Sequence, residues 1–123
     1  MNFNFVLLYV ANPPASAAFY KDLLGAPIIE ESPTFCMLPI RDGGMLGLWK
    51  RDTVQPSARA ISGANNEIAF VVSSEDVDAK HQGWKARGLT ITQPPTDMDF
   101  GRTFVALDPD GHRLRVFAPG AAR

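Results

Sequence analysis

The sequence is poor in cysteine and has no excess of charge of either sign. Cys36 is the one cysteine among 123 residues, so no disulfide can form within the chain. Twelve basic and thirteen acidic residues leave a net charge of −1, without the basic excess that nucleic-acid binding favours. These scarcities exclude a disulfide-stapled scaffold and give no reason to expect a nucleic-acid partner.

Long apolar runs are also missing. The N-terminal stretch MNFNFVLLYVANPP has a short apolar segment, without a basic leader or a small-residue cleavage site. It is too short to span a bilayer, which takes roughly 20 residues. We therefore expect it to form a first strand, and we expect a cytoplasmic protein with no membrane association. Cys36 is expected to be a small buried apolar residue, because no histidine is placed to activate it.

The chain carries one pattern twice. Residues 5–25 read FVLLYVANPPASAAFYKDLLG, and residues 67–88 read EIAFVVSSEDVDAKHQGWKARG. Each stretch begins with apolar, β-forming residues, continues through a polar capping segment into about three turns of helical pattern, and ends at a glycine. The pattern predicts a strand followed by a helix in each half.

The predicted helices cover residues 14–24 and 75–87. Asn12 and Ser73 are suited to cap their N-termini, and a glycine follows each helix. Residues at helical spacing form one stripe in each helix, and we expect each stripe to pack against the core. The stripe is Ala15, Phe19 and Leu23 in the first helix, and Val77, His81 and Trp84 in the second.

Three short strands are predicted after each helix. They lie near residues 27–30, 34–40, 45–49, 90–92, 103–107 and 113–117. Glycine turns at 42–44 and 108–111 join the last two strands of each half. The resulting order, βαβββ followed by βαβββ, predicts an α+β fold.

The domain organisation follows from this order. We expect a single domain, residues 1–123, in which residues 1–50 form the first module and 67–119 the second. The polar stretch 51–66 contains Pro56 and Gly63 and is expected to be the linker. Residues 93–102 are expected to form a loop that carries recognition residues.

Two segments, FYKDLLG at 19–25 and DPDGHRLRVF at 108–117, make the chain resemble the glyoxalase/bleomycin-resistance/dioxygenase (vicinal oxygen chelate) superfamily. The segments LLYVAN at 7–12, LGLW at 46–49 and FGRTF at 100–104 are most similar to its antibiotic-binding resistance proteins, including the phenazine-binding kind. The resemblance implies two tandem βαβββ modules with partly open, curved sheets, and a homodimer with a pocket in each trough.

The resemblance also identifies where metal-dependent members of the superfamily hold their ion. In this chain those positions are Phe5 and Gly47 in the first module, and Glu67 and Arg115 in the second. Two of the four have no side-chain donor and Arg115 is a permanent cation, whereas a catalytic zinc takes about three protein ligands. We therefore expect no metal and no cofactor, and we expect Glu67 and Arg115 to form a charge-assisted pair.

A trough without metal ligands is suited to hold a small molecule. Pockets of this kind are mostly apolar and aromatic, and flat rings favour a planar aromatic ligand. The arginines are expected to meet a carboxylate or a quinone-type oxygen. The candidate ligand-binding residues are Tyr9, Phe35, Met37, Trp49, Glu67, Met98, Phe100, Arg102, Phe104 and Arg115. For Phe35, Met37 and Phe104 a place in the hydrophobic core is an equally open interpretation.

The function predicted from these features is sequestration of a planar aromatic antibiotic or toxic metabolite, of the phenazine or bleomycin kind, without catalysis. An enzyme of the same fold, a lyase, isomerase or dioxygenase, is the first alternative. It would need metal ligands that the sequence does not reveal, or acid/base chemistry at Glu67. A regulatory or interaction module without a ligand is the second alternative.

Overall fold

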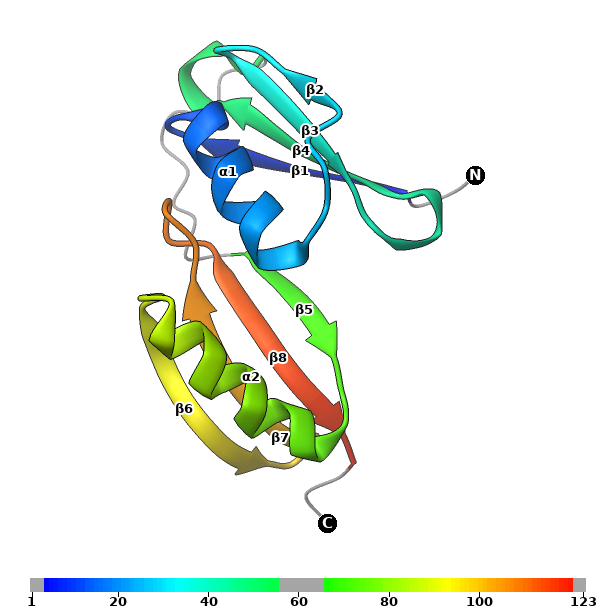
Figure 1. Ribbon diagram of the computed structural model, residues 1–123, viewed down its shortest axis with the longest axis vertical. Helices are drawn as coiled ribbons and strands as arrows, with labels where there is room; N and C mark the ends of the chain where they lie inside the picture. The colour runs from blue at the N-terminus through cyan, green and yellow to red at the C-terminus, as the bar shows by residue number, and fades with distance from the viewer. Residues whose placement is uncertain (1–3, 56–65, 121–123) are drawn as a thin grey trace. The chain divides into compact units, whose positions relative to one another are not determined.

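A computed structural model describes residues 4–55 and 66–120 of the chain, which divides into two compact units, residues 1–61 and 62–123. Each unit has one four-stranded sheet and one α-helix (Figure 1). The predicted α+β class and the duplicated βαβββ order are confirmed. Of the predicted linker, residues 56–65 lie outside the described residues, and Arg51–Thr53 form the short 3-10 turn η2.

The first unit has its strands in the order β1-β4-β3-β2. Strand β1 is parallel to β4, while β3 is antiparallel to both of its neighbours. The 3-10 turn η1, Arg41–Gly43, joins β3 to β4. The elements of this unit are β1 (Phe5–Val10), α1 (Pro13–Leu24), β2 (Glu30–Glu31), β3 (Phe35–Pro39) and β4 (Met45–Lys50).

Helix α1 begins and ends where the sequence predicts, to within one residue. The side chain of Asn12 accepts a hydrogen bond from the backbone N–H of Ala15 at 3.2 Å, and Gly25 ends the helix in the left-handed conformation at φ 66°. The predicted apolar stripe is wrong, because Ala15 is exposed and Phe19 is only half-buried. The buried face is instead Pro13, Ser16, Ala17 and Tyr20, where small residues let the helix lie close to β3 and β4.

The second unit repeats this arrangement with strand order β5-β8-β7-β6. Helix α2 packs on β6, β7 and β8, and Ser73 caps it by accepting a hydrogen bond from the N–H of Asp76 at 3.3 Å. Val77 and Trp84 of the predicted stripe are buried. The elements are β5 (Glu67–Val71), α2 (Ser74–Ala86), β6 (Ile91–Met98), β7 (Gly101–Leu107) and β8 (Arg113–Pro119).

The segment expected to be a loop, residues 93–102, is mostly β-strand. Strand β6 continues through Pro94 and Pro95 to Met98, and β7 begins at Gly101. The pairing with β7 shifts register on either side of Gln93. Proline cannot donate to a sheet ladder, but β6 is the edge strand of this sheet in the part of the chain that the structure describes. The two prolines are therefore compatible with a strand here.

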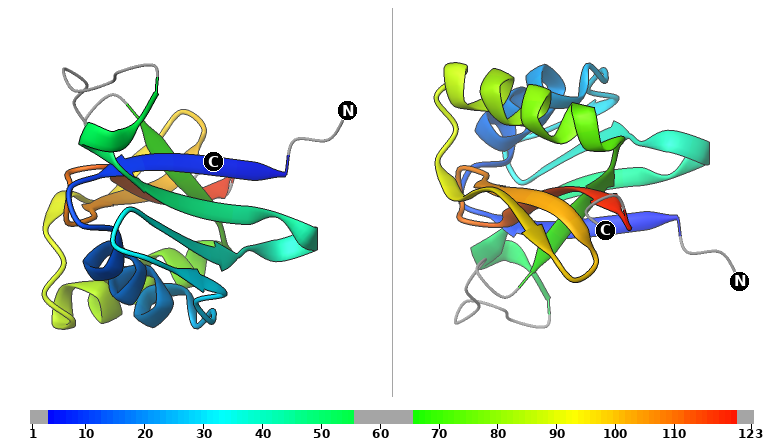
Figure 2. Two further views of the ribbon diagram at one scale, coloured as in Figure 1. Left: turned by 90° about the horizontal axis from the view of Figure 1, so that it is seen from above. Right: turned by 90° about the horizontal axis from the view of Figure 1, so that it is seen from below.

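In each unit the helix covers one face of the sheet and leaves the other face open (Figures 1 and 2). On the covered face of the first unit lie Leu8, Val10, Leu46 and Leu48, together with Cys36, which is fully buried as expected. Burial raises the pKa of the Cys36 thiol. None of the helices in the described residues is long and apolar enough to cross a membrane. The open faces carry most of the candidate site residues.

Candidate functional site

The open face of the first sheet is an apolar and aromatic surface. Side chains alternate along a strand, so every second residue of β1 points to this face. The register places Tyr9 opposite Trp49 and Trp49 opposite Phe35, so the three aromatic residues lie in a row across β1, β4 and β3. The rings of Tyr9 and Trp49 meet edge to face, with centroids 6.2 Å apart. Met37 shares this face, next to Gly47.

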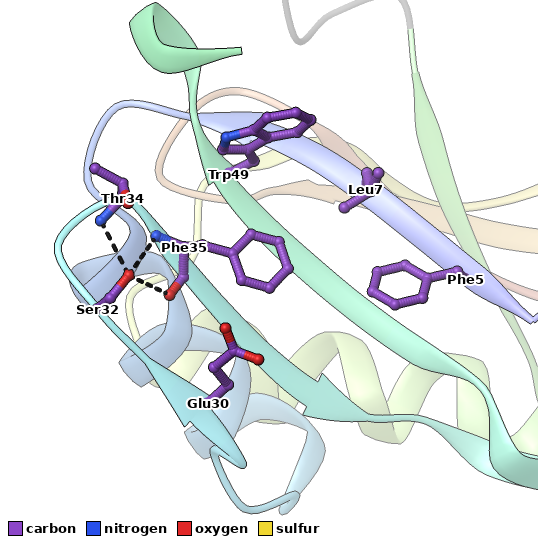
Figure 3. Close-up of a pocket in the computed structure, with 7 residues that line it drawn as sticks. All are labelled: Phe5, Leu7, Glu30, Ser32, Thr34, Phe35 and Trp49. Atoms are coloured by element: carbon purple, nitrogen blue, oxygen red, sulfur yellow. Dashed lines mark hydrogen bonds between the residues drawn. The ribbon is translucent and has the colours of Figure 1, made fainter. Parts of the chain in front are cut away.

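A hollow of about 570 Å³ lies on this face (Figure 3). The rings of Phe35 and Trp49 stand on one side of it and the side chains of Phe5 and Leu7 on the other. The residues that line it are Phe5, Leu7, Glu30, Ser32, Thr34, Phe35 and Trp49. Of the predicted ligand-binding residues, the structure thus brings Phe35 and Trp49 into one hollow and places Tyr9 beside them.

Two large apolar residues of the hollow are unusually exposed. Phe5 is 41% and Leu7 46% exposed, although both lie on a strand. Exposed apolar surface gathered in a concavity is typical of a binding site. In the sequence, Phe5 and Leu7 share the parity of Tyr9 on the first strand, which points to the trough, yet only Tyr9 was predicted to bind the ligand. That shared parity is the signal that identifies Phe5 and Leu7 as lining residues.

The polar rim of the hollow comes from the turn between β2 and β3. The hydroxyl of Ser32 donates a hydrogen bond to the carbonyl of Phe35 at 3.0 Å and accepts one from the N–H of Phe35 at 3.0 Å. It also accepts one from the N–H of Thr34 at 3.4 Å (Figure 3). These bonds hold the start of β3 and so fix the position of the Phe35 ring. Glu30, on β2, carries the one charge among the described lining residues.

Gly47 leaves room for the aromatic surface. A Cβ atom at this position would lie 2.6 Å from Cδ2 of Leu7, 2.8 Å from Cε1 of Phe5 and 3.1 Å from Cε1 of Phe35. The three side chains therefore converge over the backbone of β4. Apolar side chains of neighbouring residues therefore occupy the space beside Gly47, where metal-dependent members of the superfamily would have a ligand side chain.

On the open face of the second sheet, Glu67 and Arg115 form the predicted pair. Nε and Nη2 of Arg115 donate to Oε2 and Oε1 of Glu67 at 3.0 and 3.1 Å. Nη1 donates to Gln93 at 3.3 Å and to the hydroxyl of Thr103 at 3.2 Å. The Arg115 hydrogen bonds hold the pKa of the Glu67 carboxyl below its ordinary value.

Aromatic residues flank this pair. The guanidinium carbon of Arg115 lies 5.8 Å from the centroid of the Phe100 ring, within the range of a cation–π interaction. The Phe100 ring meets that of Phe117 edge to face at 5.9 Å. The sulfur of Met98 accepts a hydrogen bond from Gln93 at 3.4 Å. Phe100 and Met98, both candidates, thus lie on the open side with Arg115, and both are about 40% exposed.

Phe104 lies on the other face of β7, in the core of the second unit. It is fully buried, and its ring meets those of His81 and Trp84 of α2 at 5.4 and 5.3 Å. Phe104 is therefore a residue of the hydrophobic core, the second interpretation that the sequence left open. Side chains alternate along β7, so Thr103 points to the open face and Phe104 to the opposite one.

Arg102 shares the helix-facing side with Phe104. Its Nε and Nη2 donate to the two carboxylate oxygens of Asp78 on α2 at 3.1 and 3.0 Å, and Nη1 donates to Asp97 at 2.9 Å. These bonds lower the pKa of Asp78 and raise the pKa of Arg102. Arg102 fastens α2 to β6 and β7 and does not reach the open face where a ligand was expected.

The four positions compared with metal-binding positions do not fit a metal. Two have no donor atom, and the Glu67 carboxylate is already engaged by a guanidinium. In the described ranges, 4–55 and 66–120, no group of three or more histidine, cysteine, aspartate or glutamate side chains could hold an ion.

Comparison with known proteins places the geometry in a family. The profile of the Glyoxalase/Bleomycin resistance protein/Dioxygenase superfamily matches residues 2–116. The phenazine antibiotic resistance protein EhpR of Enterobacter agglomerans is 30% identical over 120 residues, covering 92% of this chain and 88% of that protein. The metallothiol transferase FosB of Staphylococcus haemolyticus is 29% identical over 115 residues, covering 92% of this chain and 80% of that protein.

A solved structure agrees with the fold. The solution NMR structure of a protein from Agrobacterium tumefaciens is 49% identical, with a TM-score of 0.87, and the match covers 98% of this chain and 99% of that one. The similarity extends over both units of the chain. The curated relatives include both a resistance protein and a transferase.

Proposed function

Because the chain belongs to the Glyoxalase/Bleomycin resistance protein/Dioxygenase superfamily, we propose that it binds and sequesters a small planar aromatic compound. The compound is an antibiotic or toxic metabolite of the phenazine or bleomycin kind, and the protein confers resistance without converting it. The protein is proposed to act as a cytoplasmic homodimer that needs no metal.

The observation that carries this proposal is the hollow on the first sheet. Two flat rings, Phe35 and Trp49, stand beside open space, and a third, Tyr9, supports Trp49 edge to face. A planar aromatic ligand would stack on these rings, and each stacked pair contributes about 0.5–1.5 kcal/mol beyond the burial of apolar area. Exposed apolar groups at Phe5 and Leu7 would be removed from water at the same time.

The similarity to EhpR supports resistance as the outcome of binding. Sequestration needs no bond to be made or broken, because a bound compound is removed from the free pool. It follows that protection lasts only while the protein is at least as abundant as the compound, and that raising expression raises the tolerated dose in proportion.

Catalysis is the second candidate, and the similarity to FosB favours it. An enzyme would change its ligand chemically, whereas a sequestering protein returns it intact. Glu67 is the acid/base group that the sequence analysis left open for a metal-free mechanism. Its side chain is bound on both oxygens by Arg115, which leaves it poorly placed to accept a proton.

The test is a calorimetric titration, in which phenazine or acridine is added to the purified protein and the heat of binding is measured. We expect saturation at about one ligand per chain, and mass spectrometry of the released ligand should show it unchanged. Trp49→Leu should weaken binding about tenfold, by removing one stacking surface. Phe19→Leu, on α1 and outside the hollow, is the matched control and should bind like the wild type. Absence of binding, or release of a modified compound, would overturn the proposal.

A further inference from the structure

We infer that the hollow of the first unit prefers planar aromatic compounds with a positive charge over neutral or anionic ones, and that Glu30 sets this preference. The inference rests on the proposed function, since it specifies which aromatic compounds the same hollow accepts. It names a chemical class, aromatic cations, and one residue that determines specificity.

Glu30 is the single charged residue among the seven described residues that line the hollow. In the sheet register it lies opposite Met37 of β3, on the open face. Figure 3 shows its carboxylate extending from β2 toward the space beside the Phe35 ring. Within the described residues this carboxylate forms no ion pair, and the residue is exposed. Its charge is thus directed at whatever occupies the hollow.

The arginines that the sequence analysis assigned to an anionic ligand are both engaged elsewhere. Arg102 is held on the helix side of the second sheet by Asp78 and Asp97. Arg115 is held by Glu67, with further bonds to Gln93 and Thr103. Neither belongs to the lining of the hollow, and none of the described residues that line it is basic. An aromatic carboxylate would therefore find no cation among the described lining residues.

The basic residues that follow Trp49 along the chain face a different space. Lys50 and Arg51 line a smaller hollow of about 220 Å³ together with Asp52. Nη2 of Arg51 donates to the carbonyl of Tyr9 at 3.5 Å. Neither side chain is among the described residues that line the aromatic hollow.

Stacking and charge favour the same ligands. A cationic ring stacked on Trp49 and Phe35 gains a cation–π attraction to the faces of those rings. The Glu30 carboxylate attracts the same cation and repels an anion, although exposure to water weakens both effects. We expect an aromatic cation to bind about 5- to 10-fold more tightly than an anion with the same rings. Salt should reduce the ratio, because the carboxylate is exposed.

The test uses three acridines that share one ring system: 9-aminoacridine as the cation, acridine as the neutral compound and acridine-9-carboxylate as the anion. Equilibrium dialysis at slightly alkaline pH gives a dissociation constant for each, at low and high salt. The expected order of affinity is cation, neutral compound, anion. The ratio between cation and anion should shrink at high salt.

Two neighbouring glutamates provide the variant and its control. Glu30→Gln keeps the shape and removes the charge, and should lower the ratio of cation to anion affinity to about 2-fold, the part that cation–π attraction supplies. Glu31→Gln makes the same change one residue along β2. Glu31 lies opposite Cys36, whose side chain is buried under α1, and so belongs to the other face. It should keep the wild-type ratio.

The outcomes separate this inference from the proposed function. If the wild type binds all three acridines equally, or if Glu30→Gln keeps the preference, the inference is overturned while aromatic binding stands. The same holds if Glu31→Gln abolishes the preference as fully as Glu30→Gln does. If none of the acridines binds, the proposed function fails together with the inference.

Discussion

Arg115 of β8 donates two parallel hydrogen bonds, of 3.0 and 3.1 Å, to the carboxylate of Glu67 on the neighbouring strand β5. Both residues occupy positions at which the superfamily resemblance placed a metal ligand. The guanidinium supplies a fixed positive charge beside the carboxylate, with a geometry that matches both oxygens. The bonds to Gln93 and Thr103 then tie β5, β6, β7 and β8 together on the open face.

Acid should weaken this pair. The Arg115 hydrogen bonds lower the pKa of Glu67 from an unfolded value near 4.5. A lowered folded pKa means that the pair contributes stability above pH 4.5, and that this contribution is lost as pH falls through the folded pKa. At neutral pH, Glu67→Gln should therefore be less stable than the wild type by about 0.5–1 kcal/mol, a range that allows for its exposure.

Urea unfolding at a series of pH values measures this effect. The difference in free energy of unfolding between wild type and Glu67→Gln should shrink toward zero as the pH is lowered from neutral through the folded-state pKa of Glu67, which lies below 4.5. Glu31→Gln, an exposed glutamate outside the pair, is the control and should show no such trend. A difference that stays constant down to the lowest pH would contradict a charge-assisted bond.

Arg102 should matter for stability and not for ligand binding. It joins Asp78 of α2 and Asp97 of β6 to β7, so Arg102→Met should lower the free energy of unfolding by about 1 kcal/mol. Its guanidinium lies on the helix side, so affinity for 9-aminoacridine should not change. Urea unfolding and equilibrium dialysis on the same preparation measure both. Loss of binding without loss of stability would place Arg102 at the ligand after all.

Local signals explain why the element order could be predicted. Asn12 and Ser73 cap their helices by hydrogen bonds to residues three positions later, and such contacts depend on a few neighbouring residues. The Glu67–Arg115 contact could also be predicted, because the superfamily resemblance brings two distant positions together. Neither inference required knowledge of side-chain packing.

The face of a strand could not be predicted in the same way. The alternation of side chains shows that Arg102 and Phe104 lie on the same side of β7. It does not show which of the two sides α2 covers. That depends on register, which places Thr103 opposite Phe117 and Phe104 opposite Val116. The strand through Pro94 and Pro95 escaped prediction for a related reason, since prolines are compatible with a strand only when it lies at a sheet edge.

The hollow itself was predicted only in part. Phe35 and Trp49 were identified as flat rings on neighbouring strands, whereas Glu30, Ser32 and Thr34 lie in and beside a strand of only two residues. Their position depends on the pairing of β2 with β3, which is too short to leave a periodic pattern.

Gly83 offers a stabilising substitution that should leave function unchanged. It lies inside α2, and a Cβ atom there would meet nothing within 4 Å. Glycine within a helix costs about 0.5–1 kcal/mol relative to alanine, so Gly83→Ala should raise the free energy of unfolding by this amount. Gly88→Ala is the contrasting variant, because its φ of 88° strains an alanine, and it should be destabilised. Thermal unfolding of both variants checks the signs, and a destabilised Gly83→Ala would show that α2 packs differently.

Gly47→Ala should damage the hollow while sparing the fold. The new methyl group would approach Leu7, Phe5 and Phe35 to within 2.6–3.1 Å, so these side chains must move. They are at most half-buried and can turn outward, which keeps the change in free energy of unfolding to about 1 kcal/mol or less.

The displaced rings no longer present the same surface to a ligand, and affinity for 9-aminoacridine should fall about fivefold. Gly83→Ala, the same substitution in the other unit and outside the hollow, is the control and should bind like the wild type. Equilibrium dialysis gives the affinities and thermal unfolding the stabilities. If Gly47→Ala binds as tightly as Gly83→Ala, the ligand does not rest on the surface formed by these three side chains, and the binding site must be sought on the second sheet, around Phe100 and Arg115.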